Sequence, residues 1–371
     1  MWEKDLMETV KLGLLIKKTK VARCGEHSYP VLSITKQDGI IMQSEKFKKR
    51  IASADTSDYK IIPRGKLVQG IHIDEGNFGI QDIVDNGIVS PAYGVWDVND
   101  GLVIPKYLEM VLRSPKSIEF YRSKLTGTVN RRGHMSDADF LSMDIPLPDR
   151  DTQSKILKTM KQTTSVLYSR QQQLAKLDEL IKARFVEMFG DPYTNSKDYP
   201  LKKGESFFKL SNGKAVPESK RLNGGIPAYG GNGISWYTDE SLFDADTIVV
   251  GRVGFQSGNV HLVKGPLWVT DNAMYMSSCD FSQYNLTFLI ELMAHVDFTK
   301  FQDAGDLKKI TQKPFMQFEY LCPPLSLQNQ FAAFVAEVDK SKLFVGSAVA
   351  HKPFDIEFFS KSTVQRFIKE V

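Results

Sequence analysis

The segment Ile145–Pro192 constrains the fold most, because it holds a long run without glycine or proline. Two prolines precede the run, and Asp151 and Thr152 offer side-chain oxygens that can cap a first helical turn. Gly190, followed by Asp-Pro, is typical of a helix end. About 38 helical residues with a rise of 1.5 Å each would span roughly 57 Å. This length exceeds one small domain, so the sequence predicts a helical rod that joins or spaces two globular bodies.

Apolar residues recur along this predicted helix at intervals that favour packing against another helix. A second apolar stripe follows near the end of the chain, where the sequence predicts a helix that starts near Ser326 and runs to about residue 345. Polar residues at other seam positions, such as Thr163 and Gln171, make the first stripe weaker than that of a strong coiled coil. The predicted seam consists of Met160, Leu167, Leu174, Leu177, Ile181, Phe185, Phe331, Val335 and Val338.

The composition is that of an ordinary soluble globular chain with room for two or three domains. It has 371 residues, of which 42% are hydrophobic and 25% charged. The formal net charge of +4 permits a polyanionic partner but does not argue for one. Three cysteines without a CxxC pair or a histidine cluster predict neither a disulfide framework nor a metal site. With no signal peptide and no apolar run of membrane-spanning length, the expected location is the cytoplasm, away from membranes.

The segments on either side of the predicted rod indicate an internal repeat of an α+β body. Residues 132–156 match residues 307–331 at a constant offset of 175, which places Gln153 on Gln328. The alternative is that any two α+β bodies look alike, but a collinear match of proline, glutamine and apolar residues disfavours it. Two similar bodies related by an approximate two-fold axis can bind two separate sites on a partner that has the same symmetry. Duplex DNA is the obvious candidate.

Upstream of that match, the helical segment Tyr107–Leu112 aligns with Asn285–Ile290. The resulting plan is body, helix, body, helix. Its predicted boundaries are residues 1–145 for the first body, 146–192 for the central long helix, 193–322 for the second body, and 323–371 for the second helix with a divergent tail.

Motifs for catalysis are missing. The nearest match to the Asn/Asp-Pro-Pro-aromatic tetrapeptide of amine methyltransferases is Cys322–Leu325, which lacks both the amide or carboxylate and the aromatic ring. Its two prolines are better explained as the end of the segment that precedes the second helix. The glycine-rich run Gly224–Gly233 is not followed by Lys-Ser or Lys-Thr, so it is not a phosphate-binding loop. We expect no catalytic residues and no metal ligands. A stand-alone DNA-modifying enzyme with an unrecognised motif, and an oligomerisation scaffold that binds no nucleic acid, stay as alternatives.

Basic, amide and aromatic side chains in the loops of both bodies predict contacts with DNA. Arg, Lys, Asn and Gln contact base edges in the major groove, and Lys and Arg also anchor phosphates. The competing interpretation is that a basic run is a solvated face and that Gly-Asn-Gly is a turn. The candidates are Lys36, Gln37, Asp38, Tyr93, Arg131, Arg132 and His134 in the first body, and Tyr229, Asn232, Trp236, Tyr237, Arg252, Lys308 and Lys309 in the second.

Several blocks resemble the specificity subunits of type I restriction–modification systems. Residues 145–156 together with 177–192 resemble the central conserved region of that family. Segments similar to its target-recognition domains are Tyr29–Ser33 and Ser90–Tyr93 for one class, and Tyr229–Gly233, Gly251–Gly254 and Trp268–Ala273 for another.

The resemblance implies two target-recognition domains that each bind one half of a split double-stranded DNA site. It also implies that the two long helices pack as an antiparallel coiled-coil pair with pseudo-two-fold symmetry. Two modification subunits, carrying S-adenosylmethionine and adenine-N6 chemistry, and a restriction subunit are the implied partners. The chain itself is then non-catalytic and binds no cofactor. The tail 346–371 departs from the pattern, since Pro353 would interrupt a helix at a cost of about 3 kcal/mol.

Overall fold

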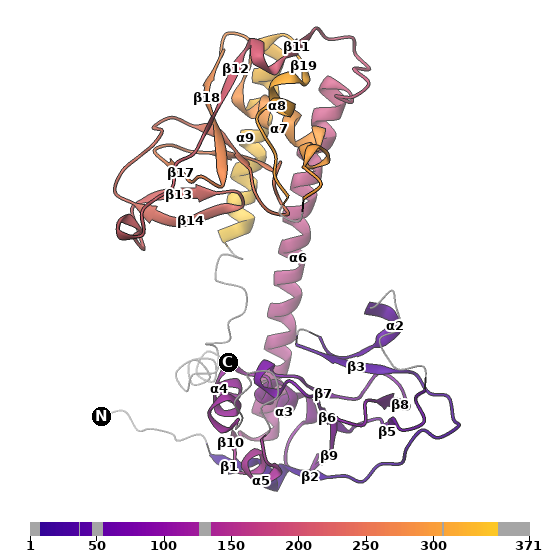
Figure 1. Cartoon of the computed structure of the whole chain (residues 1–371). Coiled ribbons are helices and arrows are strands. Elements are labelled where there is room, and N and C mark those ends of the chain that lie inside the picture. Colours follow the sequence, from indigo (N-terminus) through magenta and orange to yellow (C-terminus); the bar gives the residue numbers. More distant parts are fainter. Residues whose placement is uncertain (1–7, 37, 47–54, 126–134, 306–307, 348–371) are drawn as a thin grey trace. The chain divides into compact units, whose positions relative to one another are not determined.

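The computed structural model describes residues 8–36, 38–46, 55–125, 135–305 and 308–347. Its contacts divide the chain into two compact units (Figure 1). Among the described residues, unit 1 comprises those from 8 to 168 and unit 2 those from 169 to 347. The boundary between the units falls inside one continuous helix, and the four-part division expected from the sequence stays a prediction.

Unit 1 combines small antiparallel sheets with short helices (Figure 1). Its largest sheet has the strand order β2-β9-β6-β7, and β1 pairs with β10, β3 with β4, and β5 with β8. The strands are β1 (Thr9–Lys11), β2 (Ile16–Lys18), β3 (Leu32–Thr35), β4 (Gly39–Met42), β5 (Lys60–Pro63), β6 (Leu67–Gln69), β7 (Phe78–Ile80), β8 (Asn86–Val89), β9 (Gly94–Val98) and β10 (Asp144–Pro146). The helices are α1 (Leu12–Leu15), α2 (Gln43–Lys46), α3 (Pro105–Leu112), α4 (Pro115–Lys124), α5 (Asp137–Leu141) and the 3-10 turn η1 (Ile73–Glu75).

The main core of unit 1 combines aliphatic side chains with a group of aromatic rings. Phe78 of β7 stacks on Phe140 of α5 with ring centroids 5.5 Å apart, and Trp96 and Tyr121 lie against the same ring. The polar atoms that this packing buries have partners, because Trp96 Nε1 donates to Gln69 Oε1 at 2.9 Å and the Tyr121 hydroxyl donates to a backbone carbonyl. The four-stranded sheet and the helices are thereby held as one body.

Unit 2 contains a four-stranded antiparallel sheet of order β12-β18-β15-β16 and a three-stranded sheet of order β14-β13-β17. The strands are β11 (Leu201–Lys203), β12 (Phe208–Asn212), β13 (Ile226–Gly230), β14 (Gly233–Thr238), β15 (Thr247–Gly251), β16 (Val260–Val263), β17 (Trp268–Val269), β18 (Ala273–Cys279) and β19 (Glu319–Leu321), which pairs with β11. The helices are α7 (Leu286–Val296), α8 (Lys313–Gln317), α9 (Leu325–Ser347) and the 3-10 turns η2 (Gly204–Ser206), η3 (Glu218–Lys220) and η4 (Phe298–Phe301).

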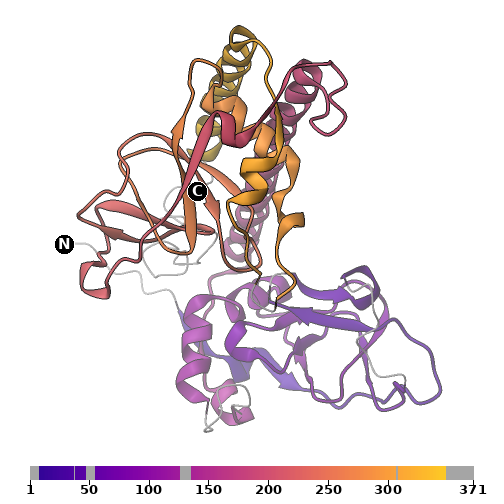
Figure 2. The ribbon, with the colours of Figure 1, turned by 45° about the horizontal axis from the view of Figure 1, so that its top comes forward.

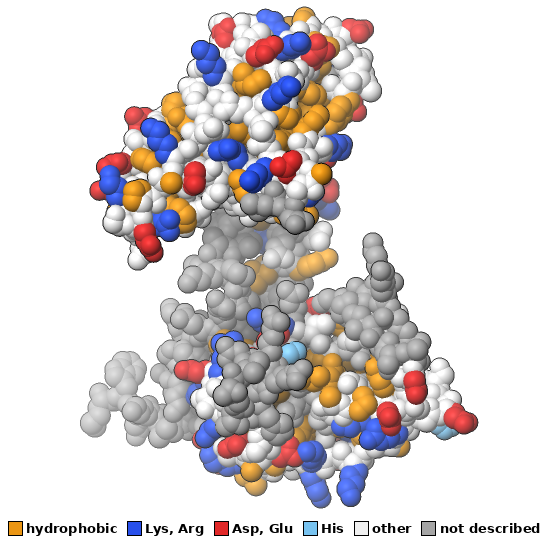
Figure 3. Space-filling view, viewed as in Figure 1, with side chains coloured by type: hydrophobic (Ala, Val, Ile, Leu, Met, Phe, Trp, Pro, Cys, Tyr) orange, Lys and Arg blue, Asp and Glu red, His pale blue; other side chains and the backbone are white. Residues whose placement is uncertain are grey.

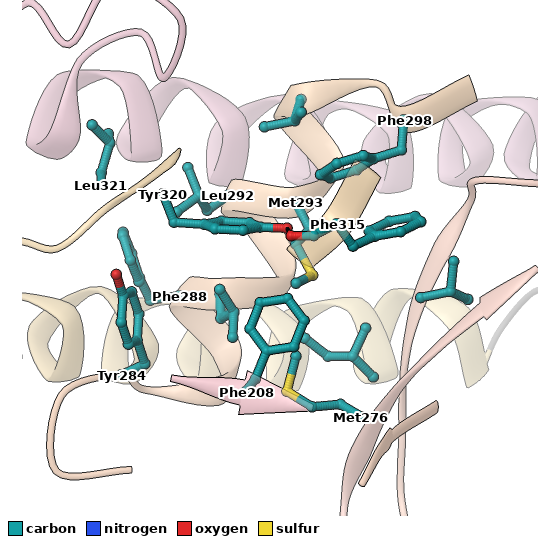
Figure 4. Close-up of a cluster of buried hydrophobic side chains, with 14 of the residues drawn as sticks. Phe208, Met276, Tyr284, Phe288, Leu292, Met293, Phe298, Phe315, Tyr320 and Leu321 are labelled. Atoms are coloured by element: carbon teal, nitrogen blue, oxygen red, sulfur yellow. Dashed lines mark hydrogen bonds between the residues drawn. The ribbon is translucent and has the colours of Figure 1, made fainter. Parts of the chain in front are cut away.

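The core of unit 2 lies where the four-stranded sheet, α7 and the segment around α8 meet (Figure 4). Phe298 stacks on Phe315 with centroids 4.0 Å apart, and the Tyr320 hydroxyl donates to the Phe315 carbonyl at 3.0 Å. Phe208 and Met276 approach this group from β12 and β18. These contacts anchor the sheet to the helices.

The predicted central helix is confirmed as α6 (Arg150–Phe189), 40 residues without interruption. Its cap differs from the prediction. Asp149, rather than Asp151 or Thr152, accepts the Thr152 N–H at 2.8 Å, and this bond lowers the pKa of the Asp149 carboxyl. The helix ends as expected at Gly190, whose φ of 78° places it in the left-handed region that glycine tolerates.

The second long helix, α9, packs antiparallel to the C-terminal part of α6 (Figures 1 and 2). Phe331 contacts Phe185 with ring centroids 5.6 Å apart, whereas Lys342, later in α9, forms an ion pair of 2.7 Å with Asp178, earlier in α6. The predicted antiparallel pair is therefore confirmed. The predicted seam residues that enter the unit 2 core are Leu177, Ile181, Phe185, Phe331, Val335 and Val338.

Met160, Leu167 and Leu174 are half-buried and belong to none of the core clusters of the described residues. The reason is length, since α9 has 23 residues and can accompany little more than half of the 40-residue α6. The predicted continuation of the seam along the first half of α6 is thus not seen in the described part of the chain.

A buried glutamine ties α6 to unit 1. Gln153 is fully buried, and its Oε1 accepts the N–H of Ile104, the N-cap residue of α3, at 2.7 Å. Its Nε2 donates to the carbonyls of Pro148 at 2.8 Å and Leu102 at 3.4 Å. One side chain thus fixes the start of α6 against the start of α3.

Gln328 makes the same bonds in unit 2. It is also fully buried, its Oε1 accepts the N–H of Asn285, the N-cap residue of α7, at 2.8 Å, and its Nε2 donates to Pro323 O at 2.8 Å and Gln283 O at 2.9 Å. The predicted offset of 175 residues between the two glutamines is confirmed at the level of individual hydrogen bonds.

The glutamine contacts correct one part of the repeat. Ile104 and Asn285 occupy equivalent N-cap positions, which are 181 residues apart, whereas the sequence alignment placed Tyr107 on Asn285. The alignment is wrong by three residues, close to one helical turn, because apolar periodicity alone tolerates such a shift. The helix α7 ends at Val296, where Asp297 adopts a left-handed φ of 51°.

Candidate nucleic-acid interface

Three segments of unit 2 that are far apart in the sequence meet at one place, here called the loop cluster: residues 230–233, 251–255 and 270–273, with 308–309 alongside. The Thr270 N–H donates to Tyr229 O at 2.9 Å. A Cβ built on Gly251 would lie 2.7 Å from the carbonyl oxygen of Gly231, closer than real Cβ contacts. Glycine at this point therefore lets two backbones touch.

Three cations border the loop cluster. Arg252 Nη1 donates to the carbonyl of Asp271 at 3.2 Å, and the Gly254 N–H donates to Lys308 O at 2.8 Å, which places Lys308 and Lys309 beside Arg252. Lys309 is exposed, and the other two are half-buried. The Lys308 ammonium donates to the backbone carbonyl of Asp303 at 3.4 Å. Within the described residues, none of the three cations forms an ion pair with a carboxylate, so they can bind anionic groups such as phosphates.

The surrounding charge is mixed. On the face of unit 2 visible in Figure 3, Lys and Arg side chains are interspersed with Asp and Glu side chains. Near the cations, the Asp303 carboxylate accepts the backbone N–H of Lys309 at 3.0 Å, and Asp271 is exposed. The cations of the loop cluster therefore have acidic side chains close to them.

The four predicted binding residues of strands β13 and β14 divide into two kinds. Asn232 lies exposed in the tight turn between the strands. Tyr229 instead packs on a core cluster, and the ring of Trp236 is covered by the Arg221 guanidinium at 4.1 Å. Tyr237 is half-buried and pairs through its backbone with residue 222. Of these four side chains, that of Asn232 is exposed and the other three are half-buried, and contact with DNA stays a prediction for all four.

In unit 1, Lys36 and Asp38 lie exposed in the turn between β3 and β4, as predicted. The turn is fixed by Arg113, which donates to Lys36 O at 2.8 Å, and by the Asp38 N–H, which donates to Thr35 Oγ1 at 3.0 Å. Four other candidates, Gln37, Arg131, Arg132 and His134, lie outside the described residues.

Tyr93, also a predicted DNA contact, is half-buried in the loop between β8 and β9. Its ring packs on a core cluster of unit 1, and burial raises the pKa of its hydroxyl. Beside it, Lys60 donates to the Tyr93 carbonyl. Burial lowers the pKa of Lys60, and the neighbouring charges of Lys18 and Arg23 lower it further. This basic group was not predicted, because its members come from separate strands and loops.

The described residues offer little for catalysis. Cys24 is fully buried and its thiol donates to the backbone carbonyl of His27 at 2.8 Å, so the pair does not form a nucleophile and base. Burial raises the pKa of the Cys279 thiol to about 12. Over the same residues, no three His, Cys, Asp or Glu side chains gather as metal ligands would. None of the described helices has both the length and the apolar character needed to cross a bilayer.

Comparisons with known proteins identify similar chains. No family model matches the sequence. A putative type I restriction enzyme specificity subunit from Haemophilus influenzae is 23% identical over 120 residues, 32% of this chain and 31% of that protein. The EcoprrI specificity subunit of Escherichia coli is 23% identical over 113 residues, 30% of this chain and 28% of that protein. The matched region therefore spans less than a third of each of these curated relatives.

Solved structures match over nearly the whole chain. The S subunit of a type I restriction–modification system from M. genitalium has a TM-score of 0.57 at 14% identity, covering 100% of this chain and 96% of that one. A chain from a structure of type I R-M complex assembly and conformational transition has a TM-score of 0.58 at 14% identity, covering 97% and 96%. The solved structures confirm the predicted fold of two α+β bodies with long helices. The curated relatives confirm the resemblance of the sequence to specificity subunits.

Proposed function

We propose that this chain is the DNA-recognition subunit of a type I restriction–modification complex. Unit 1 and unit 2 would each bind one half of a bipartite site in double-stranded DNA. The proposal is supported by the whole-chain similarity of fold to S subunits and by the sequence similarity to two specificity subunits.

The loop cluster carries the proposal. Its three segments are those whose sequences resemble a target-recognition domain, and they meet around Arg252, Lys308 and Lys309 with Asn232 exposed beside them. Cations can anchor phosphates, and an amide side chain can contact adenine in the major groove. Glycines at the contact keep the turn of Asn232 close to the cations.

The proposed partners supply the chemistry. Two modification subunits would bind S-adenosylmethionine and methylate adenine N6, a restriction subunit would join them, and this chain would bind no cofactor and catalyse nothing. Methylation requires the adenine to leave the base stack, so the chain's contribution is placement of its partners on the duplex. Val166, Tyr168 and Leu343 are 56%, 63% and 75% exposed and give α6 and α9 apolar surface for docking.

The test is to purify the chain with and without its cognate modification subunits and to select duplexes from a random pool. With the subunits present, we expect a selected site of two specified segments separated by an unspecified spacer, with affinity that falls steeply with salt. Methyl transfer from labelled S-adenosylmethionine by the chain alone would favour the stand-alone enzyme. Failure to bind any duplex under either condition would favour the oligomerisation scaffold.

A further inference from the structure

One side chain of the loop cluster is left unexplained by the functions assigned above. Phe255 is 91% exposed, more than any other large hydrophobic side chain of the described residues. It lies at the tip of a tight turn in which the Ser257 N–H donates to Gly254 O at 3.0 Å and the Gly258 N–H donates to Gly251 O at 2.9 Å. The turn directly follows Arg252.

The turn that presents Phe255 is held from both sides. Gln302 Nε2 donates to Phe255 O at 3.2 Å and to Ser257 O at 2.6 Å. On the other side the Gly254 N–H donates to Lys308 O at 2.8 Å, and Gly254 has a φ of 96° that suits glycine. The ring is therefore exposed because the backbone is fixed in a shape that directs it into water.

The neighbours of Phe255 suit a polyanion with an apolar interior. Arg252, Lys308 and Lys309 lie along the same turn and the strand-like segment that it contacts. In duplex DNA, phosphates line the edges of the grooves and stacked bases lie between them. A ring flanked by cations can meet the stacked bases while the cations meet the phosphates.

We propose that Phe255 is a wedge that inserts at a base-pair step of the half-site bound by unit 2 and partly unstacks it. The inference rests on the proposed function, because it requires unit 2 to bind duplex DNA. Apolar side chains inserted between base steps kink the duplex, and the cost depends on the step, being least at flexible pyrimidine–purine steps. Phe255 thus adds a preference for deformable sequence to the direct contacts of the loop cluster.

The experiment uses the full chain with its modification subunits and the duplex selected as above, with 2-aminopurine replacing in turn each adenine of both half-sites. The adenines that are methylated leave the stack in any case, so they raise fluorescence with or without Phe255. At the other positions the wild-type complex is expected to raise fluorescence at one step of one half-site. Phe255→Ala removes that rise and weakens binding by about 5- to 150-fold, the range for loss of one aromatic–base stack. Phe255→Trp retains both. Phe281→Ala, which removes a 59% exposed ring elsewhere in unit 2, is the matched control and changes neither.

Three results would overturn the inference. If Phe255→Ala and wild type show the same affinity and fluorescence, the ring has no role in binding. If the wild type leaves every step stacked and replacing thymine by uracil reproduces the loss of affinity, Phe255 contacts a thymine methyl group in the groove instead. If the wild-type complex binds no duplex, the proposed function fails together with the wedge.

Discussion

The buried glutamine Gln328 provides a direct test of how the long helices are fixed to the globular units. Replacing it with leucine keeps the approximate volume but leaves the Asn285 N–H and the carbonyls of Pro323 and Gln283 without a partner. The bond to Pro323 is buried, and an unsatisfied buried carbonyl costs about 1–3 kcal/mol; the two part-buried groups cost about 0.5–1 kcal/mol each because water can reach them. The expected loss of local stability is therefore about 2–5 kcal/mol.

Because the chain has two units, a single global unfolding curve is not two-state, and amide hydrogen exchange is the better assay. Gln328→Leu should accelerate exchange at the start of α7 by about thirtyfold or more, at about 1.4 kcal/mol per tenfold. Gln153→Leu should act in the same way on α3, but less strongly, since its third bond is 3.4 Å long. Gln172→Leu, on an exposed position of α6, is the control. Unchanged exchange at α7 in Gln328→Leu would refute the account of the repeat.

Three further substitutions test the core, the electrostatics and the loop cluster. Phe185→Ala removes a fully buried ring at the contact of α6 with α9 and should destabilise unit 2 by about 3–5 kcal/mol, measured by amide hydrogen exchange of its core, whereas Val186→Ala, at a 46% exposed position, should have little effect. Burial raises the pKa of Glu291 above its ordinary value of 4.5, so the folded chain binds this proton more tightly than the unfolded chain. The stability that it contributes is present at low pH and is lost as pH rises from about 4.5 through the raised pKa; Glu291→Gln should flatten that part of the stability profile, and an unchanged profile would contradict the assignment. Gly251→Ala should push the Gly231 turn away and weaken DNA binding with an unchanged circular dichroism spectrum, while equal affinity would show that the contact is not needed.

The long helix and the repeat could be predicted because both depend on features that are visible in the sequence, namely a run without glycine or proline and a pattern that recurs. A long run without glycine or proline, with apolar residues at helical intervals, favours a helix. Gly190 ends this helix because glycine adopts the left-handed backbone conformation without help from tertiary contacts. Gln153 and Gln328 each form three equivalent hydrogen bonds, which explains why residues 132–156 and 307–331 match without insertions. The cap of the helix is not determined by the sequence, since Asp149, Asp151 and Thr152 can all cap a helix and the structure uses Asp149.

The exposure of the candidate binding residues could be predicted only in part. Tyr229 and Tyr93, which the sequence predicts as contacts for DNA, also pack on core clusters, and the ring of Trp236 is covered by a guanidinium. An aromatic residue beside glycine has the same sequence signal whether its strand turns it inward or outward. Phe255 was missed for the converse reason, because its 91% exposure depends on bonds from Gln302, which is 47 residues away.

The central claim is that each unit binds one half of a split DNA site. The most direct measurement is a hydroxyl-radical footprint of the complete complex on its selected duplex, compared with that of a complex carrying Arg252→Ala. The account predicts two protected segments separated by an accessible spacer, with protection lost from one segment alone in the variant. One continuous protected segment, or loss of both segments together, would contradict it.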